Sequence, residues 1–171
     1  MVIVDTTVWV DYFNGVDSPE IAWFEREMTR RRLGLLDLMV CEILQGLSTD
    51  AEANRVLRQL QRFAILETGG VRLAEAAAQN YRRLRARGKT VRKTIDCLIA
   101  TFCLEHDHAL LHRDRDFDHF EEFLDLQVIH PDGSDVSRAS SRERGSALRD
   151  QPGVIRRRPS WIRAEGDQSL P

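Results

Sequence analysis

The stretch Met1–Trp9, MVIVDTTVW, decides the fold that we expect for this chain. Val2, Ile3 and Val4 form an apolar, β-branched run without polar alternation, which is typical of a parallel strand buried on both faces. The run ends on Asp5, and parallel α/β sheets bind ligands at the carboxyl ends of their strands. A carboxylate there, followed by two threonine hydroxyls, suits a hard cation. Taken alone, the stretch is better explained by an Asp that only caps the next helix, so the metal-site interpretation depends on whether other acids reach the same edge.

The composition indicates one globular domain. The chain has 171 residues, of which 42% are hydrophobic and 30% are charged, and this is enough for a sizeable core. The formal net charge is −2, so any binding of nucleic acid has to come from a local basic patch rather than from bulk charge.

The sequence contains neither a recognisable targeting segment nor a membrane span. No apolar run is long enough to cross a bilayer, and the first residues lack the basic-then-apolar order of a signal peptide. Cys41, Cys97 and Cys103 lie in helical patterns and form no CxxC pair. We therefore expect reduced core thiols in a cytoplasmic protein that does not bind membranes.

Short apolar runs alternate with helical patterns as far as Pro131. Strands are expected at 2–4, 33–36, 63–66 and 109–111, with an edge strand at 128–129. The predicted N-caps of the intervening helices are Ser18, Asp37, Thr49 and Thr94. This alternation predicts the α/β class, with a central, mostly parallel sheet flanked by helices.

The composition changes after Pro131, which predicts a domain boundary. Residues 134–171 hold eight arginines and five acids, a net charge of +3, with little periodic apolar pattern. Such a segment cannot bury enough apolar surface to offset the entropy lost on ordering. We expect residues 1–131 to form the domain and residues 132–171 to form a flexible basic tail.

Four acids share one position relative to the predicted sheet. They end a strand or open the helix that follows one: Asp5, Glu42, Asp96 and Asp114. Because strand ends and the following helix starts meet at one edge of a parallel sheet, these carboxylates are expected to converge. Singly, each has a plainer explanation, such as a favourable helix dipole for Asp96 or a turn at Asp114.

Converging carboxylates repel each other and take up protons unless a cation joins them. Oxygen ligands alone favour Mg²⁺, with Mn²⁺ as the alternative. Such an ion polarises a phosphodiester, supplies a bound hydroxide and neutralises the leaving oxygen. The predicted chemistry is therefore phosphodiester hydrolysis.

At these acids the chain resembles a known family. The segments MVIVDTTVWVDYF (1–13), CEILQGL (41–47), TIDCLIATFCL (94–104) and LLHRDRDFDHF (110–120) are similar, in order and separation, to the motifs of the PIN domain. Within that family, the chain resembles the VapC ribonuclease toxins of bacterial toxin–antitoxin pairs from Met1 to about Pro131. The resemblance implies a PIN-like three-layer fold and a Mg²⁺-dependent endoribonuclease that acts on tRNA or rRNA. It also implies a homodimer that is inhibited by a VapB-like antitoxin.

The resemblance also implies roles for individual residues. The acidic quartet of catalytic residues and metal ligands is matched by Asp5, Glu42, Asp96 and Asp114, and a further metal-binding acid is matched by Asp116. Thr6 matches a hydroxyl that supports the first acid. His112 stands where many members carry Thr or Ser, and we interpret it as a hydrogen-bond donor behind the metal ligands rather than as a titratable switch.

A basic cluster leads directly into the segment that carries Asp96. It consists of Arg82, Arg83, Arg85, Arg87, Lys89, Arg92 and Lys93. Such a charge run is often only a solvated helix face. An acidic metal site nevertheless needs flanking cations to hold an RNA backbone, so we interpret the cluster as the RNA-binding surface.

Large apolar residues near the N-terminal helices allow two interpretations. They are Trp9, Tyr12, Phe13, Trp23 and Phe24. The plainer interpretation is core packing, whereas a groove for an amphipathic antitoxin helix would use the same residue types. The family resemblance favours the groove.

Two other functional classes stay open. A phosphatase with an aspartyl nucleophile would also place an Asp after its first strand, but it needs a second Asp at the position of Thr7. A non-catalytic RNA-binding module could keep the fold, usually with some of the acids lost. Mg²⁺-dependent cleavage of RNA separates the three classes.

Overall fold

The computed structural model describes residues 1–131, and the predicted basic tail, residues 132–171, lies outside them. The elements are β1 (Val2–Val4), α1 (Thr6–Phe13), α2 (Pro19–Glu27), β2 (Leu33–Leu36), α3 (Asp37–Gln45), α4 (Asp50–Leu60), β3 (Ala64–Leu66), α5 (Gly70–Arg85), α6 (Thr94–Glu105), β4 (Ala109–Leu111) and α7 (Asp118–Leu124). This order confirms the predicted alternation of strands and helices.

The strands form a single four-stranded sheet in the order β3-β2-β1-β4, and every pair in it is parallel. β1 and β2 are buried along their whole length, as their unbroken apolar runs predicted. Gly34 in β2 is required by packing, because a Cβ atom there would lie 2.7 Å from the carbonyl oxygen of Ala64 in β3.

The expected edge strand at 128–129 is wrong. Val128 makes only an isolated parallel bridge with Leu110. The reason lies in the shortness of β4. Its first residue, Ala109, donates its N–H to Met1, and its last residue, Leu111, accepts from Asp5, so both face β1. Leu110 alone directs its N–H and C=O to the outer edge, where they bond Gln127 and Ile129.

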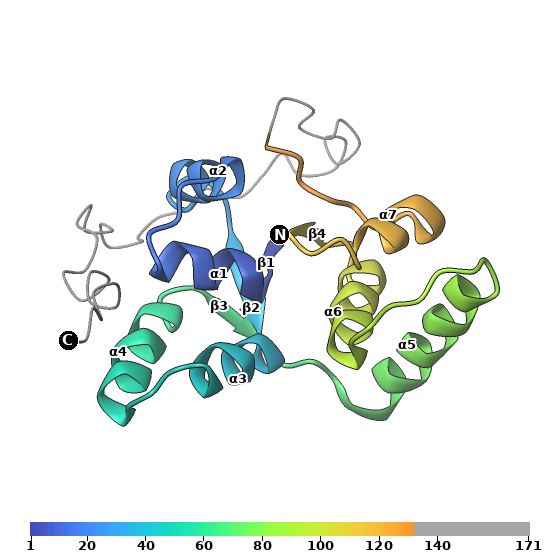
Figure 1. Cartoon of the computed structure of the whole chain (residues 1–171), viewed down its shortest axis with the longest axis horizontal. Helices are drawn as coiled ribbons and strands as arrows, with labels where there is room; N and C mark the ends of the chain where they lie inside the picture. The colour runs from blue at the N-terminus through green and yellow to red at the C-terminus, as the bar shows by residue number, and fades with distance from the viewer. Residues whose placement is uncertain (132–171) are drawn as a thin grey trace, which may run out of the picture.

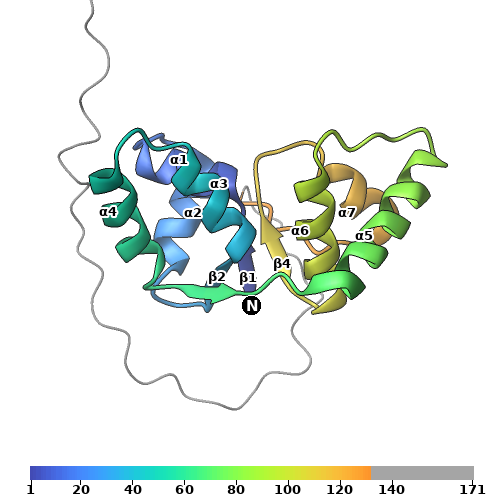
Figure 2. The same cartoon turned by 90° about the horizontal axis from the view of Figure 1, so that it is seen from below.

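The helices form two groups. Figures 1 and 2 both show α1–α4 on one side of the molecule and α5–α7 on the other, with β1 and β4 where the groups meet and β3 alongside the first group. This is the predicted layered arrangement of the α/β class. The carboxyl ends of β1 and β4 are adjacent in the sheet, so the two helix groups meet where these strands end.

The aromatic residues of the N-terminal helices belong to the core. Trp9, Phe13, Trp23 and Phe24 are buried, and Tyr12 is half-buried. The Trp9 ring packs edge-on against Phe24 and Phe63, with centroids 4.9 and 4.8 Å away, and its Nε1–H donates to the Val4 carbonyl. The interpretation as an open groove is therefore wrong for Trp9, Phe13, Trp23 and Phe24, because these four side chains are buried within the chain.

Two predicted N-caps shift by one residue. Ser18 and Thr49 cap α2 and α4 as expected. Leu36 and Lys93 occupy the N-cap positions of α3 and α6, so Asp37 and Thr94 are the first helical residues. The Asp37 carboxylate accepts hydrogen bonds from the backbone N–H of Leu38 and from the backbone N–H and hydroxyl of Thr68.

The three cysteines are free thiols, and the prediction that all are core residues is wrong for one of them. Cys97 and Cys103 are buried, whereas Cys41 lies on the exposed side of α3. Burial raises the pKa of Cys97 to about 11, so its thiol stays protonated and inert at neutral pH. Within residues 1–131, no helix is both long and apolar enough to cross a membrane.

Candidate active site

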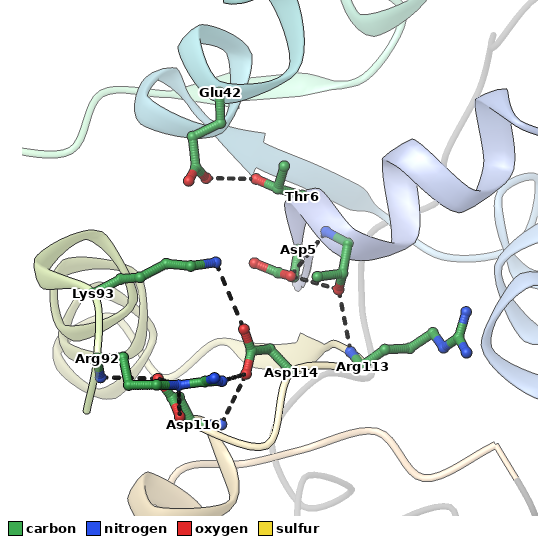
Figure 3. A network of polar contacts seen from close by, with 9 residues as sticks. Asp5, Thr6, Glu42, Arg92, Lys93, Arg113, Asp114 and Asp116 are labelled. Atoms are coloured by element: carbon green, nitrogen blue, oxygen red, sulfur yellow. Dashed lines mark hydrogen bonds and ion pairs between the residues drawn. The ribbon is translucent and has the colours of Figure 1, made fainter. Parts of the chain in front are cut away.

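The fold brings the predicted acids to the line where the two helix groups meet. Asp5 follows β1 and Glu42 lies in α3, both in the first group. Asp96 lies in the first turn of α6, and Asp114 follows β4, both in the second group. The backbone N–H of Asp5 donates to the Leu111 carbonyl at 2.9 Å, which joins the ends of the two central strands. In Figure 3, Asp5, Glu42 and Asp114 approach one another from these separate elements.

Asp5 is the N-cap of α1 and is only 3% exposed. Its Oδ2 accepts hydrogen bonds from the backbone N–H of Thr7 at 2.9 Å and from the Thr7 hydroxyl at 2.6 Å. Burial raises the pKa of Asp5 above its ordinary value, against the opposing effect of these bonds. The sequence analysis noted the Thr7 hydroxyl but did not assign it to Asp5, although the preference of an N-cap carboxylate for the second helical N–H was a usable signal.

Thr6 does not support the first acid, contrary to the expectation. Its hydroxyl donates to Oε2 of Glu42 at 2.8 Å, across 36 residues of sequence. The difference follows from helix geometry, because successive residues at the start of α1 point in different directions. Thr7 therefore faces back to the N-cap, and Thr6 reaches α3.

Asp96 is a buried carboxylate whose negative charge is not fully compensated by neighbouring groups. Its side chain is 4% exposed, and among the described residues its Oδ2 atom is buried without a hydrogen-bond partner. The pKa of Asp96 is raised to about 7, mainly by burial and further by the charges of Asp5, Asp114 and Asp116, against the lowering effect of Lys93. Asp5, Asp114 and Asp116 therefore all lie close enough to Asp96 for their charges to affect its ionisation.

Asp114 and Asp116 are tied to the loop that precedes α6. Oδ1 of Asp114 accepts from the backbone N–H of Asp116 at 3.0 Å and lies 3.4 Å from the Arg92 guanidinium, while Oδ2 lies 3.7 Å from Lys93 Nζ. Asp116 accepts from the Arg92 backbone at 2.9 Å and from Arg92 Nε at 3.2 Å (Figure 3). Burial raises the pKa of Asp116, but the bonds from Arg92 outweigh it and hold the pKa below its ordinary value.

The predicted metal ligands do not form one ligand set in this arrangement. Within residues 1–131, no three His, Cys, Asp or Glu side chains are placed to hold one ion together. The donor chemistry nevertheless fits a hard cation, because every predicted ligand is a carboxylate. A bound cation would give the orphaned Oδ2 of Asp96 a partner, and it would offset the effects that raise the pKa values of Asp5 and Asp96.

His112 does not act as the expected donor to the site. Neither ring nitrogen has a hydrogen-bond partner among the described residues, and both are buried. The ring packs against Phe117, with centroids 5.0 Å apart, and burial lowers the pKa of His112. Among the described residues, the His112 imidazole therefore contacts the Phe117 ring and donates no hydrogen bond to the predicted metal ligands.

The basic cluster divides into three parts. Arg92 and Lys93 reach the carboxylates, as described above. Arg87 and Lys89 lie over the Phe123 ring of α7, with their cationic groups 5.8 and 5.4 Å from its centroid. Arg82, Arg83 and Arg85 are exposed at the end of α5. The structure thus presents the cluster to solvent from the end of α5 up to the acids.

Comparisons with known proteins agree with this geometry. A family model described as PIN domain matches residues 2–122. Ribonuclease VapC11 of Mycobacterium tuberculosis and a VapC ribonuclease of Mycobacterium bovis are each 32% identical to this chain over 130 residues, which span 75% of this chain and 97% of each relative. The chain therefore belongs to the PIN domain family and, within it, to the VapC ribonucleases.

Solved structures support the same fold. VapBC2 from Rickettsia felis, bound to a DNA fragment from its promoter, aligns with a TM-score of 0.62 at 15% identity over 75% of this chain and 98% of that chain. FitAcB from Neisseria gonorrhoeae aligns with a TM-score of 0.61 at 22% identity over 77% of this chain and 98% of that chain. At such identities the likeness concerns the fold, and it agrees with the PIN-like fold that the family resemblance implied.

Proposed function

We propose that this chain is the ribonuclease toxin of a toxin–antitoxin pair and cleaves RNA phosphodiester bonds with a divalent cation held by its acidic quartet. The observation that carries the proposal is Asp96, a buried carboxylate with an unpartnered oxygen and a pKa raised to about 7, beside the buried Asp5. A fold does not maintain two such carboxylates for stability, because they destabilise it when ionised. The names of the 32% identical relatives support RNA as the substrate.

Asp5, Glu42, Asp96 and Asp114 would hold the cation, Mg²⁺ or alternatively Mn²⁺. When bound, such an ion polarises the phosphodiester, lowers the pKa of attacking water and neutralises the leaving oxygen. Before the ion binds, Asp96 has to lose the proton that its raised pKa retains. Metal binding is therefore expected to weaken as the pH falls below about 7.

The residues behind the acids orient them. The Thr7 hydroxyl engages Oδ2 of Asp5, which leaves Oδ1 for the cation, and the Thr6 hydroxyl engages Oε2 of Glu42, which leaves Oε1. Hydrogen bonds of this kind fix the carboxylate rotamers. The same Thr7 hydroxyl accepts from the backbone N–H of Arg113 at 3.2 Å, so the loop that carries Asp114 is coupled to Asp5.

The exposed basic cluster supplies the phosphate contacts that an acidic site lacks. Arg82, Arg85, Arg87 and Lys89 lie at the end of α5 and in the loop after it, which leads to Arg92 and Lys93 at the acids. A single strand that followed this path would reach the quartet with its backbone neutralised.

A VapB-like antitoxin is the partner that we propose, and a homodimer is the proposed assembly. The solved structures with this fold include VapBC and FitAB complexes, which supports the pairing. The antitoxin does not use Trp9, Phe13, Trp23 or Phe24 as its contact surface, because these side chains are buried within the single chain.

The test is cleavage of an end-labelled RNA by the purified full chain, with and without Mg²⁺. We expect cleavage only with the metal, none by an Asp5→Asn variant of normal thermal stability, and no hydrolysis of a phosphomonoester. Metal-independent cleavage, or wild-type cleavage by Asp5→Asn, would contradict the proposal. Phosphomonoester hydrolysis would instead favour the phosphatase class.

A further inference from the structure

Arg92 and Lys93 place their positive charges beside the acidic residues of the proposed metal site. Lys93 is the N-cap residue of α6, and Asp96 lies three residues further along, so one helix start positions both. Figure 3 shows the Lys93 side chain extended toward Asp114, on the side of the site that Asp5 and Glu42 also face. Its Nζ lies 3.7 Å from Oδ2 of Asp114.

Lys93 and Lys89 are the only two lysines in a chain with 25 Lys and Arg residues. An ammonium group is a compact point charge on a flexible stem, whereas a guanidinium is a rigid fork. Lys93 is therefore the member of the basic cluster that can enter and leave a metal site with little rearrangement. Its side chain is 57% exposed, whereas that of Asp114 is 14% exposed, so the ammonium has room to move and its partner does not.

Asp116 differs from the four acids of the quartet because Arg92 donates hydrogen bonds to both of its carboxylate oxygens. Both of its carboxylate oxygens accept hydrogen bonds from Arg92, through the backbone N–H at 2.9 Å and through Nε at 3.2 and 3.3 Å. A metal ion that bound Asp116 would have to compete with these bonds, one at Oδ1 and two at Oδ2. By contrast, Oδ2 of Asp96 has no partner among the described residues.

We propose that Lys93 is an internal cation that competes with the divalent metal for the acidic quartet, and that Asp116 is a positioning residue that holds Lys93 there by anchoring Arg92. This inference rests on the proposed metal site. It differs from the role that the family resemblance implied for Asp116, because it assigns Asp116 to the loop before α6 and not to the metal.

Lys93 has a different partner with and without bound metal. Without metal, its ammonium reduces the repulsion among Asp5, Asp96 and Asp114. When the metal binds, the same ammonium is repelled from it and becomes free to meet an RNA phosphate oxygen. Lys93 therefore moves between two anionic partners, one in the protein and one in the substrate.

The experiment measures the affinity for Mg²⁺ alone, in the absence of RNA, by calorimetric titration of the full chain. We compare the wild type with Lys93→Gln and with Lys89→Gln. The second variant is a matched control, since it removes the same charge from the same loop, where Lys89 lies over Phe123. An exposed ion pair contributes little, so we expect Lys93→Gln to bind Mg²⁺ about two- to fivefold more tightly. Lys89→Gln should match the wild type.

Asp116→Asn separates the two roles of Asp116. If Asp116 holds Lys93 at the acids by anchoring Arg92, the variant should bind Mg²⁺ more tightly than the wild type, and unchanged binding would overturn this positioning role. The effect of Asp116→Asn should then not add to that of Lys93→Gln in the double variant. Weaker Mg²⁺ binding by Asp116→Asn would identify Asp116 as a ligand and overturn the positioning role.

The remaining outcomes distinguish this inference from the proposed function. Unchanged or weaker Mg²⁺ binding by Lys93→Gln, with normal binding by the wild type, overturns the competition and leaves the metal site intact. Failure of the wild type and all variants to bind Mg²⁺ or Mn²⁺ overturns the metal site itself, and the competition with it.

Discussion

The hydroxyl of Thr6 donates a 2.8 Å hydrogen bond to the carboxylate of Glu42 and thereby joins the start of α1 to α3. The neighbouring hydroxyl, that of Thr7, bonds Asp5 instead. Two adjacent threonines thus each hold one acid of the proposed metal site, from a single turn of helix. A hydroxyl that sets the rotamer of a ligand affects metal binding without touching the metal.

We predict that Thr6→Val lowers the apparent affinity for Mg²⁺ in RNA cleavage by about tenfold, because Glu42 loses the bond that orients it. Valine keeps the shape of threonine, so thermal unfolding should change little. The measurement is cleavage rate against Mg²⁺ concentration. Thr6→Ser keeps a hydroxyl and should recover most of the affinity, and a serine variant as impaired as the valine variant would argue against this role.

Thr7→Val is expected to be more damaging. It removes the 2.6 Å bond to Asp5 and the acceptor of the Arg113 backbone N–H, so the loop carrying Asp114 is loosened as well. It also removes a hydrogen bond that lowers the pKa of Asp5. Cleavage should fall by about 10- to 100-fold. The cleavage rate of Thr7→Val should partly recover at higher pH, where Asp5 ionises again. A ratio of variant to wild-type rate that does not change with pH would contradict this explanation.

The third prediction concerns stability and its dependence on pH. The pKa of Asp96 is about 7 in the folded chain, against an ordinary value of 3.8 in the unfolded one. The folded state thus binds more protons between these values, so the contribution of Asp96 to stability is lost as the pH rises toward and through 7. Without metal, Asp96→Asn should therefore raise the melting temperature by roughly 5 °C at pH 8 and by much less at pH 5.

The difference in melting temperature between the variant and the wild type is taken at each pH, because the contributions of the other titrating groups are the same in both proteins and cancel. His112 has a lowered pKa and contributes in the opposite direction over part of this range. Saturating Mg²⁺ should reduce or reverse the advantage of Asp96→Asn at pH 8, because only the wild type gains from the metal. An equal difference in melting temperature at pH 5 and pH 8 would mean that Asp96 is not the group that titrates.

The fourth prediction concerns the basic cluster. Replacing Arg85, Arg87 and Lys89 with Ala should weaken RNA binding and flatten its dependence on salt, by about 0.7 in the logarithmic slope for each phosphate that the variant no longer binds. The exposed Arg58 and Arg72 lie outside the cluster, and their replacement with Ala serves as the control. Binding titrations of a labelled single strand at several salt concentrations provide the slopes. Equal slopes for both variants would show that the cluster is only a solvated helix face and does not bind RNA phosphates.

The sequence by itself determined the class of fold and the positions of the acids along the chain. Uninterrupted β-branched and leucine-rich runs at Val2–Val4 and Leu33–Leu36 predict strands buried on both faces, and the helical spacing between them predicts parallel connections. These signals are local, because side-chain periodicity follows directly from backbone geometry. The placement of Asp5 and Asp96 at one sheet edge then follows from the topology of parallel strands.

Only the tertiary structure decided which partner each side chain meets. Thr6 bonds Glu42 rather than Asp5, Arg92 occupies Asp116 across 24 residues, and the aromatic rings near Trp9 are buried rather than left as a groove. The single bridge at Val128 likewise depends on which way the backbone of β4 faces. Such contacts join segments far apart in sequence, and they depend on distances of a few ångströms that no local pattern encodes. The physical reason is that hydrogen bonds and ion pairs require specific geometry, whereas the burial of apolar runs requires only their periodicity.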